Sequence, residues 1–281
     1  MTTIEAVHDV TRELAAAGVP SPRVDAEQLV AHATSSSRSA LYCADPLEGA
    51  DLRRLRTLVE RRARREPLAY VLGEWGFRRL TLVVDPRVLV PRPETEIVVE
   101  RCLAALADVA EPRVLEVGVG SAAIALSLVD EHQGARVLAV DSSAEALALA
   151  RVNIEHAGAA DRVELLHGDL LAGAAGPFDL VVSNPPYVLP AEFESLQPEI
   201  RLYEPRAALV GVGVGEEVAR RALDVLPPGG WIVLESADSR ADALATALSE
   251  LGYSDVAITA DLAGRPRVVE GRRPRDYNRR P

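Results

Sequence analysis

The residues with the most specific chemistry form the tetrapeptide Asn184-Pro185-Pro186-Tyr187, which follows the apolar run 178–183. The run has the length of a buried strand, and prolines cannot extend a strand ladder, so these residues are expected at a strand end. The side-chain carbonyl of Asn184 and the main-chain carbonyl of Pro185 can accept both hydrogens of one planar NH2 group. The Tyr187 ring can lie against the same plane. This clamp suits an amide or an exocyclic base amine, whose nitrogen lone pair is tied up by resonance.

Accepting both hydrogens of such a group raises the electron density on its nitrogen and directs that nitrogen toward an electrophile. The site then acts by positioning and electrostatics, and it needs no covalent intermediate and no metal ion. Taken alone, the tetrapeptide is also compatible with a proline-rich turn that closes a strand.

A glycine-rich turn made of Gly118, Val119, Gly120, Ser121 and Ala122 lies between a predicted strand and a predicted helix. Glycines let the backbone approach a ligand closely, and the start of the helix directs N–H groups at whatever sits there. A degenerate dinucleotide fingerprint would have the same residues. The turn therefore predicts a cofactor site without choosing the cofactor.

Two acidic residues at later strand ends extend this prediction. Asp141 stands 21 positions after Gly120, where a carboxylate can accept from both hydroxyls of a ribose, although aspartate also caps helices well. Asp169 and Leu170 are placed to meet the amino group and the ring face of an adenine. Nicotinamide cofactors and S-adenosylmethionine both carry adenosine. The clamp at Asn184 favours S-adenosylmethionine, because hydride transfer has no use for it.

Segments of strand and helix length alternate from residue 113 onward, which predicts a parallel, doubly wound α/β sheet. The predicted strands are 114–117, 136–140, 162–166, 178–183, 231–235, 255–259 and 267–270, and the predicted helices are 121–130, 144–156, 216–226 and 239–251.

The first part of the chain has the apolar spacing of a small helical bundle, with helices expected at 4–17, 21–33 and 48–65. The third helix carries seven arginines between positions 53 and 65, which predict either a solvated face or a docking surface for an acidic partner or its RNA. The predicted domains are a helical domain over 1–66, a hairpin and proline-rich linker over 67–93, which can also roof a ligand, and a second domain over 94–281.

Composition limits the class of protein. The 281 residues include 31 basic residues, all of them arginine, and 42 acidic residues, which gives a net charge of −11. This balance argues against broad, sequence-independent binding to duplex nucleic acid. Cys43 and Cys102 lack the spacing of metal ligands, and no run reaches the ~18 apolar residues of a membrane span. Since the first ten residues also lack a signal-peptide core, we expect a soluble cytoplasmic protein with reduced thiols.

Taken together, these motifs resemble the peptide chain release factor glutamine methyltransferases, the HemK/PrmC family of class I S-adenosylmethionine-dependent methyltransferases. The likeness covers most of the chain and is most specific in the linker 91–96 combined with the tetrapeptide 184–187. The family usually has Gly-Thr-Gly-Ser-Gly in the cofactor turn, and this chain departs from that pattern at Val119 and Ala122. Further segments that carry the resemblance are 66–73, 203–209 and 261–267.

The resemblance implies a Rossmann-like domain with a mostly parallel seven-stranded sheet and an antiparallel closing strand, preceded by a helical substrate-recognition domain and a β-hairpin. It also implies N5-methylation of a glutamine in the Gly-Gly-Gln loop of a release factor, with no membrane partner. Residues 118–122 would hold the methionine end of the cofactor, Asp141 its ribose, and Asp169 and Leu170 its adenine. Asn184 and the Pro185 carbonyl would take the amide hydrogens, with Pro186 beside them and Tyr187 on the amide plane.

Three other interpretations stay open at this point. A divergent relative would methylate a different protein amide or a small-molecule amide or amine. An adenine-N6 nucleic-acid methyltransferase would use the same clamp on a flipped base. A protein that kept the fold as a cofactor-binding adaptor would bind S-adenosylmethionine without turnover.

Overall fold

The structure, a computed structural model, describes residues 1–43 and 45–275 and divides into two compact units. The helical unit consists of Met1–Glu74 and Leu196–Tyr203, and the sheet unit consists of Trp75–Ser195 and the chain from Glu204 onward. The domain limits predicted at residues 66 and 93 stay predictions. The sequence prediction placed Leu196–Tyr203 in the second domain, whereas the structure groups this segment with the helices of the first part of the chain.

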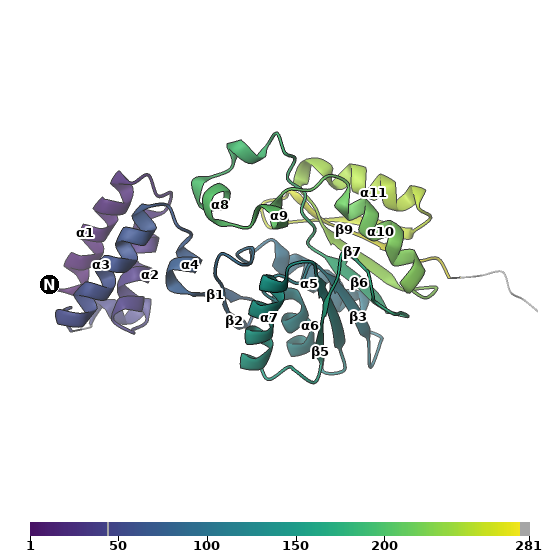
Figure 1. The fold of residues 1–281 in the computed structure, drawn as a ribbon, viewed down its shortest axis with the longest axis horizontal. Helices are drawn as coiled ribbons and strands as arrows, with labels where there is room; N and C mark the ends of the chain where they lie inside the picture. Colours follow the sequence, from purple (N-terminus) through teal and green to yellow (C-terminus); the bar gives the residue numbers. More distant parts are fainter. Residues whose placement is uncertain (44, 276–281) are drawn as a thin grey trace, which may run out of the picture. The chain divides into compact units, whose positions relative to one another are not determined.

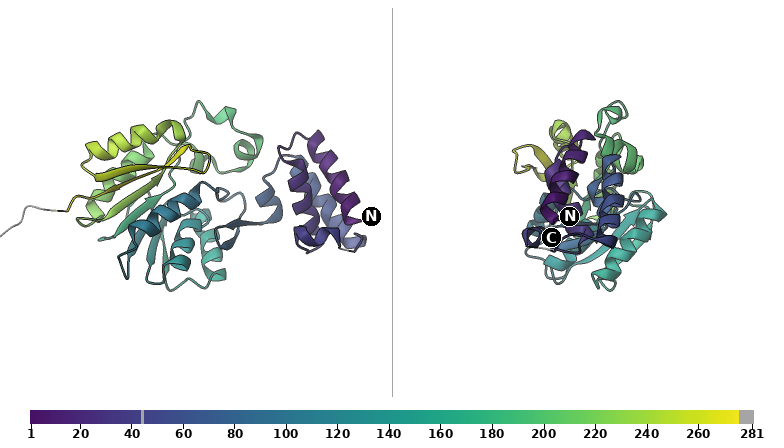
Figure 2. Two further views of the ribbon diagram at one scale, coloured as in Figure 1. Left: turned by 180° about the vertical axis from the view of Figure 1, so that it is seen from behind. Right: turned by 90° about the vertical axis from the view of Figure 1, so that its left-hand side faces the viewer.

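In the helical unit, the helices α1, α2 and α3 lie side by side (Figures 1 and 2). Apolar residues at three- and four-residue steps, such as Val7, Val10 and Leu14, are buried between them. Thr2 and Glu5 form a capping box that begins α1. The helices of this unit are α1 (Thr3–Ala16), α2 (Pro22–Ala33), the 3₁₀ helix η1 (Arg38–Tyr42), α3 (Gly49–Ala63), α4 (Leu68–Leu72) and α8 (Pro198–Tyr203).

A buried ion cluster joins α8 to the other helices of the helical unit. Arg62 donates to Asp25 at 2.7 Å and to Glu199 at 2.9 Å. Arg65 donates to both carboxylate oxygens of Glu199, at 2.7 and 2.6 Å. Tyr203 adds a hydrogen bond of 2.7 Å from its hydroxyl to the Arg64 carbonyl. Glu199 lies far along the sequence from these arginines, which is why the sequence did not pair them.

This cluster corrects the interpretation of the arginine-rich helix for Arg61, Arg62 and Arg65. Arg62 is buried, and Arg61 is paired with Glu66 at 2.5 Å. Arg61 also donates to the Tyr70 and Val71 carbonyls. Neither a solvated face nor a free docking surface describes these side chains, because their acceptors belong to the same chain. Arg53, Arg54, Arg56 and Arg64 are exposed, and for them the predicted solvated face or docking surface stays a prediction.

The sheet unit is built on a seven-stranded sheet with the order β5-β4-β3-β6-β7-β9-β8. Five strands from β5 to β7 pair in parallel, and β9 is antiparallel to both of its neighbours. The predicted mostly parallel sheet with an antiparallel closing strand is confirmed. The strands are β3 (Arg113–Val117), β4 (Arg136–Asp141), β5 (Val163–His167), β6 (Leu180–Ser183), β7 (Trp231–Glu235), β8 (Ser254–Ala260) and β9 (Pro266–Arg272).

Helices cover both faces of this sheet (Figure 1). The helices α5, α6 and α7 pack on one face, and α10 and α11 pack on the other. A short hairpin of β1 (Glu74–Phe77) and β2 (Leu80–Val83) precedes them. The helices are α5 (Thr95–Ala105), α6 (Ala123–Glu131), α7 (Ala144–His156), α9 (Arg206–Leu209), α10 (Val214–Val225) and α11 (Ala241–Glu250), with 3₁₀ turns η2 (Phe193–Ser195) and η3 (Asp238–Arg240).

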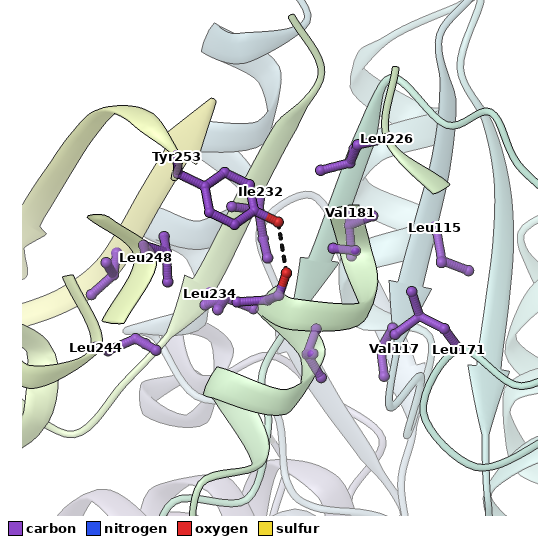
Figure 3. Packing of buried hydrophobic residues seen from close by; sticks show 14 of the residues in the cluster. Leu115, Val117, Leu171, Val181, Leu226, Ile232, Leu234, Leu244, Leu248 and Tyr253 are labelled. Carbon is purple, nitrogen blue, oxygen red and sulfur yellow. Dashed lines mark hydrogen bonds between the residues drawn. The ribbon is translucent and has the colours of Figure 1, made fainter. Parts of the chain in front are cut away.

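The core between the sheet and α10 and α11 is almost entirely aliphatic, as the scarcity of aromatic residues requires (Figure 3). Its two aromatic members are Phe178 and Tyr253. Tyr253 is buried in the cluster with Ile232 and Leu248. Its hydroxyl donates to the Ala219 carbonyl at 2.7 Å, so the buried polar atom is satisfied (Figure 3).

The short helices α4, α8 and α9 are not in the sequence prediction. Each has six residues or fewer, too short for a hydrophobic period to identify it. The hairpin that was expected from residue 66 accordingly begins only at Glu74. Among the residues that the structure describes, no helix is both long enough and apolar enough to cross a bilayer.

Candidate active site

Three strands of the sheet end at the same edge and bring the predicted site residues together. In the register of the sheet, Val117 is the partner of Val140 on β4 and of Ser183 on β6. The next residues along these three strands begin the glycine turn, end β4 at Asp141 and begin the tetrapeptide at Asn184. Ligands of open α/β sheets bind at this carboxyl edge.

A cavity of about 520 Å³ lies at this edge, within the sheet unit. Its volume is typical of sites for small molecules and cofactors. The lining includes Gly118 to Ser121, Asp141, Asp169, Leu170, Asn184, Pro185 and Pro186, together with Pro91, Arg92, Thr95 and Glu116.

The glycine turn is held by backbone hydrogen bonds that leave its outer face free for a ligand. The N–H groups of Gly118 and Val119 both donate to the Val140 carbonyl, at 2.8 and 3.1 Å. Gly118 has φ +79° and Gly120 has φ +50°, which are left-handed values that glycine adopts without strain. Val119 is buried and also belongs to the lining of the cavity, so the departure from threonine places an apolar residue in its wall.

Ala122 adopts a left-handed conformation at the start of α6, with φ +65°. The family pattern has glycine here, and a left-handed alanine costs roughly 1–2 kcal/mol. Asn153 of α7 supports the turn next to it, since its Nδ2 donates to the Ser121 carbonyl at 2.9 Å. The same side chain bonds both main-chain groups of Val83. The departure from glycine at this position is therefore accommodated in the backbone of the turn.

The Asp141 carboxylate is oriented by two main-chain N–H groups. Oδ2 accepts from Gly120 at 3.0 Å, and Oδ1 accepts from Ser143 at 2.9 Å. Each oxygen keeps a further lone pair for a ligand hydroxyl. Asp169 and Leu170 line the same cavity beyond the end of β5, and Leu170 is left-handed at φ +53°.

Glu116 lines the cavity at its base with a carboxylate oxygen that has no partner. The residue is 1% exposed, and Oε2 makes no hydrogen bond within the described part of the chain. Burial raises the pKa of Glu116 well above its ordinary value. A buried acceptor without a donor is costly, so a ligand that brings a donor or a positive charge would satisfy it.

The charge of the cavity fits S-adenosylmethionine better than a dinucleotide. The cavity lining includes the carboxylates of Asp141 and Asp169, the buried carboxyl group of Glu116, and Glu217, which is paired with Arg220 and Arg221. Arg87 and Arg92 also line it, but each is already paired, with Asp85 and Glu204 respectively. The cofactor carries a positive sulfonium and a positive ammonium group, whereas a dinucleotide carries an anionic pyrophosphate. The residues present therefore fit the methyl-donor cofactor.

The tetrapeptide divides between two adjoining cavities. Asn184, Pro185 and Pro186 line the large cavity, and the two prolines also line a smaller one of about 170 Å³. Tyr187 lines only the smaller cavity. Its hydroxyl donates to Glu235 Oε1 at 3.2 Å, and burial raises its pKa. The tyrosine therefore sits behind the wall formed by the prolines.

The proline-rich linker forms part of the wall of the large cavity. The sequence analysis had suggested that this linker could roof a ligand. Pro91, Arg92 and Thr95 belong to its lining. Arg92 donates to both carboxylate oxygens of Glu204, at 2.5 and 2.7 Å, which ties the linker to the chain before α9. Although Arg92 is paired with it, burial raises the pKa of Glu204.

Sequence reasoning missed four side chains that organise this edge: Thr95, Glu116, Asn153 and Glu235. Thr95 lies in the linker 91–96 and Glu116 in the strand predicted at 114–117, and neither was given a role. Glu235 was visible only as an acid at the end of an apolar strand. Asn153 gave no signal, because it sits within an ordinary helical pattern. Their partners come from other elements, so no local spacing relates them.

The fold and the site together define a class I S-adenosylmethionine-dependent methyltransferase. The catalytic domain of hMettl16 superimposes with a TM-score of 0.56 at 15% identity, over 69% of this chain and 77% of that chain. At that identity the likeness concerns the fold alone. The profile described as "Methyltransferase small domain" matches residues 95–200.

The profile described as "PrmC N-terminal domain" matches residues 5–73. A release factor glutamine methyltransferase of Geobacter sulfurreducens is 42% identical, with 96% of each chain covered. One of Deinococcus radiodurans is 43% identical, over 94% of this chain and 95% of the relative. The chain belongs to the release factor glutamine methyltransferase family, whose cofactor is S-adenosylmethionine, and the family resemblance inferred from its motifs is confirmed.

Proposed function

We propose that this protein methylates the N5 side-chain nitrogen of the glutamine in the Gly-Gly-Gln loop of a class I peptide chain release factor. One observation carries the proposal: Asn184 and Pro185 line the same cavity as the glycine turn, in a chain of this family. The proposed amide clamp and the proposed cofactor site would therefore share one cavity. We further propose that the protein acts in the cytoplasm, where its acceptor is made.

On the acceptor side, the side-chain carbonyl of Asn184 and the main-chain carbonyl of Pro185 accept the two amide hydrogens of the glutamine. Tyr187 lines the smaller cavity together with Pro185 and Pro186, and we propose that its ring supports the amide plane of an acceptor that enters from that side. Holding both hydrogens keeps electron density on the nitrogen and aims its lone pair into the large cavity.

On the cofactor side, Gly118 to Ser121 would hold the methionine portion, with Ala122 buried behind them, and Glu116 would offer its unpaired oxygen. Asp141 accepts from the ribose hydroxyls, while Asp169 and Leu170 border the adenine. When bound, the cofactor supplies an electrophilic methyl group on a positively charged sulfur. The proton that leaves the methylated nitrogen is accepted by solvent or by a group of the clamp.

The test is transfer of labelled methyl groups from S-adenosylmethionine to a purified release factor, with the product located by mass spectrometry. Label is expected on the Gly-Gly-Gln glutamine and not on an acceptor whose glutamine is replaced by alanine. Calorimetry with S-adenosylmethionine runs in parallel, because binding without transfer to any protein would favour a cofactor-binding adaptor.

Asn184→Ala separates the proposed roles. We expect this variant to bind S-adenosylmethionine nearly as well as the wild type and to lose about 100-fold or more in turnover, since it lacks one acceptor of the clamp. Thr246→Val, on an exposed turn of α11, serves as the matched control with unchanged turnover. Wild-type turnover in Asn184→Ala would refute the clamp.

A further inference from the structure

A chain of hydrogen bonds, buried at its centre, connects Asn184 to Tyr187. Asn184 Nδ2 donates to Thr95 Oγ1 at 3.3 Å, and Thr95 Oγ1 donates to Glu235 Oε2 at 2.7 Å. The other oxygen of Glu235 accepts from the Tyr187 hydroxyl at 3.2 Å. Both ends of the tetrapeptide are thus connected through one carboxylate.

Three elements meet to form this chain. Thr95 is the first residue of α5, Glu235 is the last residue of β7, and Asn184 directly follows β6. Because β6 and β7 are parallel neighbours with Ser183 opposite Leu234, Asn184 and Glu235 leave the sheet side by side. Thr95 and Glu235 are only 5% and 2% exposed, so water does not substitute for either of them.

The direction of the hydrogen bonds follows from the chemistry of the groups. An ionised carboxylate only accepts, so Glu235 takes the single proton of the Thr95 hydroxyl. Thr95 Oγ1 can then only accept from Asn184, which places the NH2 of that amide toward Thr95. The oxygen of an amide lies opposite its nitrogen. Oδ1 of Asn184 is therefore turned away from Thr95, where it can accept from an incoming amide.

Glu235 holds this position without a direct ion pair to a cation. Among the residues that the structure describes, no arginine forms an ion pair with it. Burial raises the pKa of Glu235 above its ordinary value of 4.5. The hydrogen bonds from Thr95 and Tyr187 and the positive charge of Arg267 offset only part of that rise. A buried carboxylate in this state destabilises the fold, and it persists where it serves an arrangement of other groups.

We propose that Thr95 and Glu235 are positioning residues, which fix the Asn184 side-chain amide with its oxygen presented to the acceptor. This inference rests on the proposed function for its consequence in catalysis. The orientation itself is a property of the protein alone. Without the Thr95 hydroxyl or the Glu235 carboxylate, the amide is free to rotate and to present its NH2 group, which repels an acceptor amide.

The orientation is tested without any substrate. The chain contains three asparagines, so protein labelled with ¹⁵N-asparagine gives three side-chain NH2 signals, and Asn184→Ala assigns the one that matters. We expect the Asn184 signal to be protected from solvent exchange and to shift and lose protection in Thr95→Val. The Asn153 signal is the internal control and stays in place. An Asn184 signal that is unchanged in Thr95→Val would overturn the proposal, even for a protein with no activity on release factors.

The catalytic consequence is tested by a pair of variants at one position. Thr95→Val keeps the shape of the side chain and removes the hydroxyl, and we expect kcat to fall roughly 10- to 100-fold. Thr95→Ser keeps the hydroxyl and should stay within about threefold of the wild type. The Kd for S-adenosylmethionine should change less than about twofold in both, as expected for a change confined to the acceptor side. Equal loss in both variants, or a matching loss of cofactor affinity, would indicate a structural role and sink the proposal.

Combined variants show whether the two residues act through Asn184. Glu235→Met keeps an unbranched side chain and removes the acceptor of both hydroxyls, so kcat should fall at least as far as in Thr95→Val. Adding Thr95→Val to Asn184→Ala should cause no further loss, since the amide that Thr95 orients is already gone. A multiplicative loss in that double variant would contradict the mechanism. An inactive wild type would instead refute the proposed acceptor and leave the NMR result to decide the orientation.

Discussion

Two buried glutamates, one in each unit, have opposite surroundings. Glu199 of the helical unit accepts three hydrogen bonds from Arg62 and Arg65, whereas Glu235 of the sheet unit accepts one each from two neutral hydroxyls. Burial alone would raise the pKa of Glu199, but the hydrogen bonds from Arg65 and Arg62 outweigh it and lower the pKa. For Glu235 burial dominates and raises the pKa.

This difference separates a carboxylate that stabilises a fold from one that orients a site. Glu199 brings α8 onto the other helices of its unit, and its charge is matched by the arginines around it. Glu235 has no matching charge, and both of its oxygens are used to orient side chains of the tetrapeptide region. A buried charge without a cation is a poor stabiliser, so we attribute its presence to the geometry that it imposes.

The largest effect is expected from Arg62→Ala. The substitution leaves Asp25 without its buried cation and deprives Glu199 of one of its two, and breaking a buried pair in this way costs about 3–5 kcal/mol. The measurement is the free energy of unfolding of the helical unit in denaturant. Arg56→Ala on the same helix is the control, because its exposed pair with Glu60 contributes less than about 1 kcal/mol. Similar losses of unfolding free energy in Arg62→Ala and Arg56→Ala would show that the buried ions around Glu199 stabilise the unit no more than an exposed ion pair does.

A smaller effect is expected at a third type of carboxylate, one oriented by main-chain N–H groups. Asp141→Asn loses the charge that accepts from the ribose, which we estimate at about 1.5–3 kcal/mol of cofactor binding. The Kd for S-adenosylmethionine should accordingly rise roughly 10- to 150-fold by calorimetry. Asp242→Asn, an exposed residue of α11, is the control and should bind like the wild type. Unchanged binding in Asp141→Asn would refute the ribose assignment.

The two glutamates are compared directly by the same substitution. Glu199→Gln removes charge-assisted hydrogen bonds and should lower the free energy of unfolding by about 1–3 kcal/mol with little change in cofactor binding. Glu235→Gln removes an unmatched buried charge and keeps one acceptor, so stability should not fall while turnover does. A loss of stability in Glu235→Gln as large as that in Glu199→Gln would break the comparison.

The smallest and most diagnostic effect is the pH dependence of the stability differences between the wild type and the two glutamine variants. The folded-state pKa of Glu199 lies below the ordinary value of 4.5, so its stabilising contribution is present above that pH and is lost as the pH falls through the folded value. The folded-state pKa of Glu235 lies above 4.5, so stability is lost as the pH rises through it. The stability of wild type relative to each glutamine variant, measured across this range, should therefore change in opposite directions. The same direction for both would contradict the assignment.

Much of the site was predictable because its residues stand at strand ends that the sequence identifies. Asp141 and Asn184 each close an apolar run, and parallel strands bring such residues to one edge. The Arg62 and Glu199 pairing was not predictable, since 137 positions separate the two residues. The short helix α8 also lacked a hydrophobic period that would have placed Glu199 in the helical unit.

The sequence by itself determined the family and the order of the longer strands and helices, and it supplied the residues of the proposed amide clamp. These depend on local patterns of residues, namely apolar periods, glycines and prolines whose conformational limits act wherever they occur. Only the tertiary structure decided which way the Asn184 amide faces. That direction depends on a proton of Thr95 and a carboxylate of Glu235, and these come from separate elements that meet only when the sheet and α5 have packed.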